Sequence, residues 1–239
     1  MERTLIIIPT YNEIDNIEAI INKVFETGLD LDVLVVDDKS PDGTDKIVIE
    51  LMSKYKTQLF LESRSEKSGL GAAYVHGFKW ALKRQYQYIF EMDADFSHNP
   101  KELAPMLEKL KNDTDLIVGS RYVNGVNVIN WPMSRVLLSY FASKYVQLIT
   151  SMPIKDATAG FVGYRRAVLE SIVLDEVKFV GYAFQIELKY KAWIKKFKLN
   201  EHPIIFTNRI LGKSKMSSNI ILEAFYGVIF LRINKNRFK

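Results

Sequence analysis

The sequence contains no cysteine and only three histidines. Without cysteine there can be no disulfide framework, no thiolate metal site and no cysteine nucleophile. The histidines, His76, His98 and His202, lack the spacing of metal ligands, so we interpret each as a structural or surface residue. His98 is the one that merits a test, because it follows closely on two aspartates.

Two common nucleotide-binding motifs are also missing. No complete P-loop (G-x-x-x-x-G-K-S/T) is present, which argues against a P-loop NTPase. Residues 69–74 read GLGAAY, which lacks the third glycine of the dinucleotide fingerprint and follows the third expected strand rather than the first. The sequence therefore disfavours a nicotinamide- or flavin-dependent oxidoreductase.

No apolar run reaches the ~20 residues that span a bilayer. The two best candidates, residues 136–149 and 219–231, are interrupted by Lys144 and Glu223, and they fit a buried or interfacial helix better. The N-terminus shows no signal-peptide pattern and leads directly into an expected strand. We therefore expect a protein on the cytoplasmic side, without a transmembrane segment.

The formal net charge is +5, and the basic residues gather in residues 189–198 and 232–239. Such runs indicate either a solvated surface or contact with an anionic partner: phosphates, nucleic acid or an anionic membrane face. Nucleic-acid binding lacks a matching motif, so we do not expect it.

The 239 residues, 48% of them hydrophobic, suffice for one large domain with a sizeable core. Five short apolar runs have the character of buried strands; they span residues 4–10, 32–38, 59–62, 88–92 and 115–121. Helical periodicity separates them, with Asn12 and Thr44 expected to cap the first two helices. This alternation predicts an α/β fold with a mostly parallel, Rossmann-like central sheet and helices on both faces.

The pattern changes after Arg121. We expect a loop over residues 122–130, helices over 132–150, 184–196 and 219–233, and a strand at 204–206. Residues 209–218 form a basic loop with Gly212 and Ser214, which suits a lid that closes on phosphate.

Polar residues follow the expected strands at the end where parallel sheets bind ligands, and Asp93 and Asp95 are the most informative of them. Side chains alternate along a strand, so both carboxylates project the same way. Two like charges at this distance favour a divalent cation between them. The alternative is that the acidic pair only forms a turn before a helix that starts at Asn99 and Pro100.

A cation at Asp93 and Asp95 could neutralise a diphosphate and stabilise it as a leaving group. Asp37, which follows the second strand, could accept hydrogen bonds from a base or a ribose. These residues together predict a site for a nucleoside-diphosphate substrate.

Several segments resemble one family in order along the chain: PTYNE (9–13), VVDDKSPDGT (35–44), GLG (69–71), MDADFSH (92–98) and GSRY (119–122). They look like the inverting family 2 glycosyltransferases of the GT-A fold, and more closely like the dolichol-phosphate (polyprenol monophosphate) mannose synthases. The resemblance continues through residues 156–161, 181–187 and 209–217, so it covers nearly the whole chain.

The resemblance implies that mannose passes from GDP-mannose to a polyprenyl (dolichyl) phosphate with inversion at the anomeric carbon. It implies Mg²⁺ or Mn²⁺ at Asp93 and Asp95, which act in catalysis with Arg121. Arg135 and Ser139 would contact the acceptor phosphate. Residues carried over as donor-binding are Pro9, Tyr11, Glu13, Val35, Asp37, Asp93, Ala94, Asp95, Arg121, Arg209 and Lys215.

Some relatives have Gln where this chain has Ser97, which puts a third side-chain metal ligand in doubt and leaves that position to water. An inverting transfer to an alcohol needs a general base. A phosphate monoester is already ionised near neutral pH, so no base is required here.

We expect a single glycosyltransferase domain over residues 1–239, with a nucleotide-binding half at about 1–121 and an acceptor and membrane-facing half at about 122–239. The helices at 132–150 and 219–233 are expected to hold the protein peripherally on a membrane, and a membrane subunit is a further expected partner. The alternative is that both helices are ordinary core. Two other functions stay open: a prenyl-phosphate glucosyl or other sugar transferase that uses a UDP-sugar, and a non-catalytic nucleotide-binding membrane module.

Overall fold

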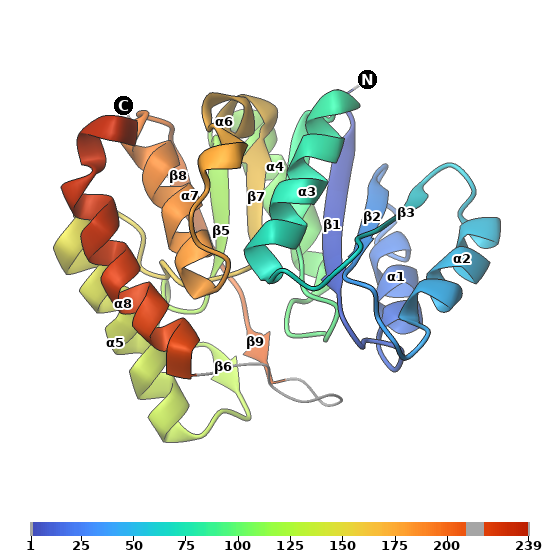
Figure 1. The fold of residues 1–239 in the computed structure, drawn as a ribbon, viewed down its shortest axis with the longest axis horizontal. Coiled ribbons are helices and arrows are strands. Elements are labelled where there is room, and N and C mark those ends of the chain that lie inside the picture. The colour runs from blue at the N-terminus through green and yellow to red at the C-terminus, as the bar shows by residue number, and fades with distance from the viewer. Residues whose placement is uncertain (1, 209–217, 239) are drawn as a thin grey trace.

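The computed structural model describes residues 2–208 and 218–238, which fold around a seven-stranded sheet (Figure 1). The strand order is β3-β2-β1-β4-β7-β5-β8, and only β7 runs antiparallel to its neighbours. The strands are β1 (Thr4–Thr10), β2 (Asp32–Asp37), β3 (Leu59–Ser63), β4 (Tyr88–Glu91), β5 (Leu116–Ser120), β7 (Val162–Arg165) and β8 (Leu199–Pro203). The predicted mostly parallel sheet is confirmed.

Helices cover both faces of this sheet (Figure 1). One face packs against α1 (Ile17–Phe25), α2 (Thr44–Lys54) and α4 (Leu103–Asn112). The other packs against α3 (Leu70–Lys83), α6 (Arg166–Ser171) and α7 (Tyr182–Ile194). Strand β1 shows why its sequence is continuously apolar: Leu5 and Ile7 join one core, and Ile6 and Ile8 join the other.

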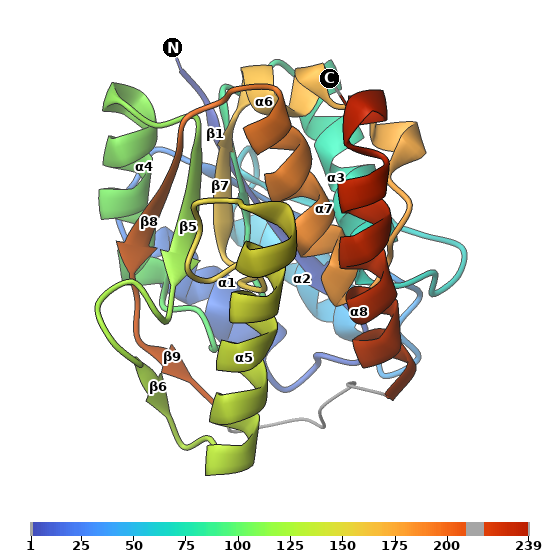
Figure 2. The ribbon, with the colours of Figure 1, turned by 90° about the vertical axis from the view of Figure 1, so that its left-hand side faces the viewer.

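Two further helices, α5 (Met133–Thr150) and α8 (Ser218–Ile233), lie side by side at one end of the molecule (Figures 1 and 2). The rings of Tyr145 on α5 and Phe225 on α8 stack with centroids 4.9 Å apart, and α8 also packs against α7. Among the described residues, none of the helices is both long and apolar enough to cross a bilayer.

Two predicted helix caps are wrong. The first helix begins at Ile17 with Asn16 in the N-cap position, because Asn12 adopts a left-handed conformation (φ 56°) in the turn that leaves β1. In the second helix Gly43 (φ 90°) occupies the N-cap position and Thr44 is already helical. The Thr44 hydroxyl instead accepts from the backbone N–H of Glu13, which joins this turn to the one after β1.

The predicted strand at 204–206 is also wrong. Strand β8 comes earlier, pairs with β5 at the edge of the sheet, and is only half-buried, so its polar residues hide it in the sequence. Phe206–Thr207 forms β9, which pairs with β6 (Val128–Ile129) in a separate two-stranded sheet; β6 lies within the predicted 122–130 loop. The predicted basic loop at 209–218 lies, apart from Ser218, outside the described residues.

The strand order reverses between β1 and β4, since β2 and β3 lie on one side of β1 and the remaining strands lie on the other. In open α/β sheets this switch in order marks where ligands bind, at the carboxyl ends of the strands. Strands β7 and β8 come from the second half of the chain, so the sheet does not follow the predicted division at residue 121; that division stays a prediction about binding.

Candidate active site

Three turns with unusual backbones meet at the carboxyl ends of β1, β2 and β4. Asn12, Lys39 and Phe96 each follow one of these strands and have φ values of 56°, 57° and 61°. A residue other than glycine in this region costs on the order of 1 kcal/mol and persists only where the surroundings enforce it. Such positions concentrate at functional sites, so the backbone marks the same edge that the strand order marks.

Asp37 ties the ends of β1 and β2 together and is almost fully buried. Its carboxylate accepts hydrogen bonds from the Thr10 hydroxyl (2.8 Å), the Ser40 hydroxyl (2.6 Å) and the Ser40 backbone N–H (2.8 Å). This supporting role was not predicted from the sequence. The predicted hydrogen bond from a base or ribose to Asp37 stays a prediction, as a carboxylate has lone pairs for further donors.

The other residues predicted to bind the donor lie at different depths. Pro9, Tyr11 and Glu13 are half-buried at and just beyond the end of β1. The Lys67 ammonium lies 3.9 Å from the centroid of the Tyr11 ring, and Glu13 accepts from the Asn16 side chain at 3.1 Å. Val35 lies inside β2 and is fully buried. The structure thus brings Pro9, Tyr11, Glu13 and Asp37 to one edge and leaves the Val35 side chain in the core; the predicted donor contacts stay predictions.

The acidic pair leaves the end of β4, with Asp93 half-buried and Asp95 buried. Residues of the same loop support both: the Ser97 backbone N–H and hydroxyl donate to the Asp95 carboxylate, and the Asp93 backbone N–H donates to His98 Nδ1 at 3.1 Å. Ala94, between the aspartates, is buried. The helix cap is supplied by Asn99, whose side chain accepts from the Lys101 N–H, so capping does not account for the acidic pair.

The donor set at this loop fits a hard divalent cation. The described residues contain no group of three histidine, cysteine or carboxylate side chains that could hold a metal. Mg²⁺ and chemically similar ions commonly bind through one or two carboxylates, and they keep water and substrate phosphate oxygens in the other positions. Asp93 and Asp95 can supply such a pair of carboxylates, so a third side-chain ligand is not needed. The Ser97 hydroxyl donates to Asp95 instead.

The three histidines are structural or surface residues, as predicted. His98 is buried, and its ring stacks on Phe161 with centroids 5.0 Å apart. Burial lowers the pKa of His98 to about 4, so it is neutral at neutral pH and its Nδ1 accepts from Asp93. His76 pairs with Glu62 at 3.0 Å and His202 with Glu102 at 2.8 Å.

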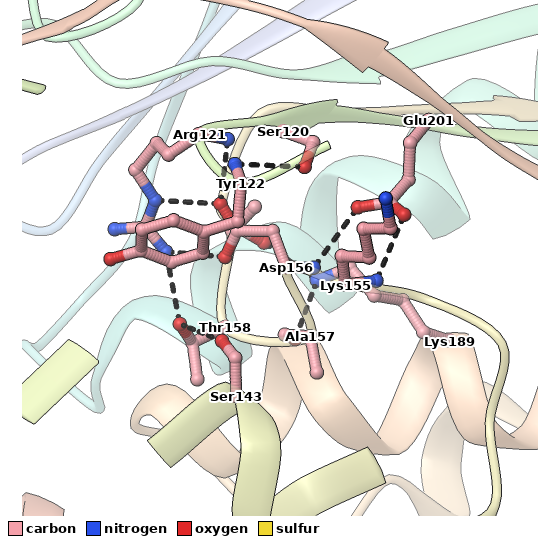
Figure 3. Close-up of polar contacts among 11 residues, drawn as sticks. Ser120, Arg121, Tyr122, Ser143, Lys155, Asp156, Ala157, Thr158, Lys189 and Glu201 are labelled. Carbon is pink, nitrogen blue, oxygen red and sulfur yellow. Dashed lines mark hydrogen bonds and ion pairs between the residues drawn. The ribbon is translucent and has the colours of Figure 1, made fainter. Parts of the chain in front are cut away.

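Arg121, which directly follows β5, forms a buried ion pair with Asp156 (Figure 3). Its Nε and Nη2 donate to the two carboxylate oxygens at 2.7 and 2.5 Å, and its backbone N–H donates at 2.9 Å. Nη2 also donates to the Thr158 hydroxyl at 2.9 Å. This bidentate geometry fixes the direction of the guanidinium group; the predicted role of Arg121 in phosphate binding and catalysis stays a prediction.

Two charged residues, the half-buried Glu201 and the buried Lys189, hold the loop that carries Asp156 (Figure 3). The Glu201 carboxylate accepts from the backbone N–H groups of Lys155 and Asp156 at 2.8 and 3.0 Å. The Lys189 ammonium donates to the carbonyls of Ala157 and Ala159, and its burial lowers its pKa to about 8. The sequence analysis gave Glu201 no role, and it counted Lys189 in the basic run 189–198, which it interpreted as a solvated surface or a contact with an anionic partner; the burial of Lys189 shows that this residue is neither solvated nor exposed.

A second buried polar group lies beneath the acidic pair. Glu91, the last residue of β4, accepts from the Tyr164 hydroxyl at 2.9 Å and from the Gln185 side chain. Burial raises the pKa of Glu91 to about 8, so this carboxyl group is mostly protonated at neutral pH. The sequence analysis assigned Glu91 to a strand and gave it no role of its own.

The residues predicted to bind the acceptor lie on α5 beside the β6–β9 sheet. Arg135 Nη1 donates to Asn208 at 2.9 Å, and its guanidinium carbon lies 4.0 Å from the centroid of the Trp131 ring. The guanidinium of Arg121 lies 5.4 Å from the same ring, so the structure brings both arginines together. Ser139 is half-buried one turn along α5 from Arg135. Arg209 and Lys215 lie outside the described residues.

A mostly parallel sheet with an acidic pair beyond its central strand is the arrangement of the GT-A glycosyltransferases. The sequence model described as glycosyl transferase family 2 matches residues 5–173. The chain belongs to this family.

Two relatives match nearly the whole chain. The polyprenol monophosphomannose synthase of Mycolicibacterium smegmatis is 46% identical over 227 residues, which cover 95% of this chain and 86% of that protein. The undecaprenyl-phosphate mannosyltransferase of Micrococcus luteus is 40% identical over 226 residues, which cover 95% of this chain and 92% of that protein. These homologues are glycosyltransferases of the kind that the sequence resemblance indicated.

Solved structures with lower identity share the fold. The glucosyl-3-phosphoglycerate synthase from Mycobacterium tuberculosis, in complex with Mn²⁺, UDP and glucosyl-3-phosphoglycerate, has a TM-score of 0.69 and 14% identity, covering 98% of this chain and 79% of that one. A mannosyltransferase from Pyrobaculum calidifontis, in complex with GDP-Man and Mn²⁺, has a TM-score of 0.61 and 17% identity, covering 99% and 71%. At these identities the likeness shows the fold alone.

Proposed function

We propose that this chain transfers mannose from GDP-mannose to a polyprenyl (dolichyl) phosphate with inversion at the anomeric carbon. The proposal rests on one observation: two carboxylates, Asp93 and Asp95, follow β4, and the fixed guanidinium of Arg121 follows β5. The names of the two relatives that match 95% of the chain support mannose as the sugar and a prenyl phosphate as the acceptor.

The proposed donor site occupies the carboxyl ends of β1, β2 and β4. Asp93 and Asp95 would hold Mg²⁺ or Mn²⁺, which when bound stabilises the charge that develops on the departing diphosphate. Pro9, Tyr11, Glu13 and Asp37 lie where the guanosine would bind, and Asp156 fixes Arg121 for a phosphate contact. Ala94, Val35, Arg209 and Lys215 complete the predicted donor set.

The proposed reaction needs no general base. An oxygen of the acceptor phosphate forms a bond to the anomeric carbon while the bond from that carbon to the diphosphate breaks, and the electron pair leaves with GDP. The attacking oxygen is already ionised at neutral pH. The neutral, hydrogen-bonded His98 is consistent with a site in which positioning and charge neutralisation carry catalysis.

We also propose that α5 and α8 hold the protein peripherally on the cytoplasmic face of a membrane. Helix α5 exposes large apolar side chains to solvent: Phe141 is 62% exposed and Leu148 is 80% exposed. On α8 Tyr226 and Ile233 are exposed beside it. Exposed apolar side chains on two helices that also carry the exposed Lys144 and Arg232 suit an anionic lipid surface, where the acceptor lipid is dissolved.

Transfer of radiolabelled mannose tests the function directly. With Mn²⁺ and polyprenyl phosphate, GDP-[¹⁴C]mannose should yield a radioactive lipid, and EDTA should abolish its formation until Mn²⁺ is restored. A parallel reaction with UDP-[¹⁴C]glucose in place of GDP-mannose serves as the control for donor choice. Efficient transfer of glucose with none of mannose would overturn the donor assignment, and binding of GDP-mannose without any transfer would favour a non-catalytic module.

A further inference from the structure

The hydroxyl of Tyr122 is a buried polar group without a hydrogen-bond partner among the described residues. Tyr122 follows Arg121 directly, and 5% of its surface is exposed. A buried hydroxyl that makes no hydrogen bond costs free energy, and native proteins seldom retain one without a reason. The hydroxyl therefore indicates a position where a ligand atom is expected.

The groups around this hydroxyl are suited to an anion. The Ser139 side chain faces it without meeting hydrogen-bond geometry, and the charges of Arg121 and Arg135 both act on it. The indole N–H of Trp131, the ring that contacts both guanidinium groups, is a second buried donor without a partner among the described residues. Figure 3 shows the Arg121 guanidinium alongside the Tyr122 ring. The guanidinium carbon lies 5.2 Å from the centroid of that ring.

One negative charge also belongs to these surroundings. Asp156 acts on Tyr122 as well, but both of its carboxylate oxygens are engaged by Arg121. Burial raises the pKa of the Tyr122 hydroxyl above its usual value, and the two arginines oppose that shift. The hydroxyl is thus protonated at neutral pH and is able to donate to an anionic oxygen.

We propose that the Tyr122 hydroxyl donates a hydrogen bond to the phosphate monoester of the acceptor, in a subsite that it forms with Ser139 between the guanidinium groups of Arg121 and Arg135. This inference rests on the proposed function and adds Tyr122 to the residues that the family resemblance supplied. The subsite favours a dianionic phosphate, because hydroxyl and guanidinium donors face it and the carboxylate of Asp156 is engaged by Arg121.

The test is Tyr122→Phe, which removes the hydroxyl and keeps the ring. Binding of geranyl phosphate, a short prenyl phosphate, is measured by calorimetry in the presence of GDP and Mn²⁺, together with the KM for polyprenyl phosphate. Loss of one hydrogen bond to a charged group should weaken the binding of geranyl phosphate about tenfold and raise the KM for polyprenyl phosphate about tenfold. The affinity for GDP-mannose should not change. Tyr140→Phe is the matched control, because its ring packs edge-on against Tyr122 at 5.5 Å.

Thermal unfolding separates this role from a structural one. A hydroxyl without a protein partner contributes no stabilising bond, so Tyr122→Phe should unfold at the wild-type temperature or above it. A lower unfolding temperature with unchanged geranyl phosphate binding would overturn the proposal. So would a loss confined to GDP-mannose, which would place the hydroxyl at the donor.

Two further measurements distinguish free phosphate from a prenyl phosphate as the ligand, and the Tyr122 subsite from the proposed mannose transfer. Inorganic phosphate should bind more weakly than geranyl phosphate but show the same dependence on Tyr122. If the wild type binds geranyl phosphate through Tyr122 yet transfers no mannose, the subsite stands and the proposed donor is wrong. If the wild type binds neither phosphate, the subsite is refuted even where mannose transfer to another acceptor is observed.

Discussion

The donor edge and the acceptor region of this molecule are built in different ways. At the donor edge many of the supporting hydrogen bonds lie within one turn: Ser97 supports Asp95 two residues away, and Ser40 supports Asp37 three residues away. Others join neighbouring turns, as the bond from Thr10 to Asp37 does across 27 residues. In the acceptor region they join distant segments: Arg121 pairs with Asp156 across 35 residues, and Arg135 with Asn208 across 73. The loop of Asp93 and Asp95 is thus held mainly by its own residues, whereas the acceptor region is held by segments that only the fold of the domain brings together.

The largest expected effect concerns the donor edge. Asp95→Asn should reduce mannose transfer by about 100-fold or more, because a neutral amide holds a divalent cation poorly and the leaving charge is no longer neutralised. Initial rates and Mn²⁺ calorimetry measure the loss. Asp113→Asn, at an exposed carboxylate that ends α4, is the control and should keep wild-type activity. A rate within threefold of wild type for Asp95→Asn would refute the metal site.

The next effect compares ion pairs in the two regions. Asp156→Asn should destabilise the fold by about 3 kcal/mol, because it leaves the buried Arg121 charge without its partner. Asp38→Asn, which breaks the pair with Arg64 at 2.8 Å beside the donor edge, is the matched variant. It should cost less, since the Arg64 side chain is 15% exposed and water can reach it. Urea unfolding gives both values, and equal losses would contradict the contrast.

The buried charge of Lys189 should give the acceptor region its own pH dependence. Its folded pKa of about 8 lies below the ordinary 10.5, so the stability it contributes is fully present above pH 10.5 and is lost as pH falls toward 8. Between pH 8 and 9.5 the free energy of unfolding should therefore rise by up to about 1.4 kcal/mol per pH unit from this group.

Lys189→Met should lack that rise, and urea titrations at several pH values measure it. Lys83→Met, which removes an exposed ammonium at the end of α3, should keep it. Parallel pH profiles for Lys189→Met and the wild type would show that the ammonium is not buried as the structure places it.

The smallest expected effect concerns the lipid surface. Leu137→Glu with Phe141→Glu should reduce flotation with anionic liposomes about fivefold, because both side chains are exposed on α5 and would bury apolar area in the interface. Ile49→Glu with Val173→Glu, at two exposed apolar positions elsewhere, should leave flotation unchanged. Equal flotation of all variants with unchanged circular dichroism would remove α5 as the contact.

The same contrast explains how much could be predicted from the sequence. The strands β1, β2 and β4 are buried on both faces, so their apolar runs predicted them closely, and the acidic pair follows directly from one of these runs. The edge strand β8 was missed because its residues, LNEHP, are half-buried or exposed and include three consecutive polar side chains, so no apolar run marks it. The Asn12 cap was wrong because a left-handed turn, which the composition does not reveal, delays the helix to Ile17.

Long-range partners explain the remaining misses. Asp156 was assigned to a polar turn that leads into a strand and to a resembling segment, but its pairing with Arg121 was not predicted, because it requires β7 to return antiparallel between β4 and β5. The same return places Tyr164 beside Glu91 and fixes the loop that Lys189 holds. No spacing along the chain encodes these contacts, since each depends on the order of strands in the finished sheet.

The antiparallel strand β7 also has a consequence for biosynthesis. As the nascent chain leaves the ribosome, β4 and β5 are synthesised before the strand that lies between them in the finished sheet, so neither can yet pair with it. Residues 162–165 complete both pairings, and Gly163 fits between the strands because a Cβ there would come within 2.5 Å of the Phe90 ring. Translation arrested before this point would leave the sides of β4 and β5 that face β7 without a partner strand and open to pairing with other chains.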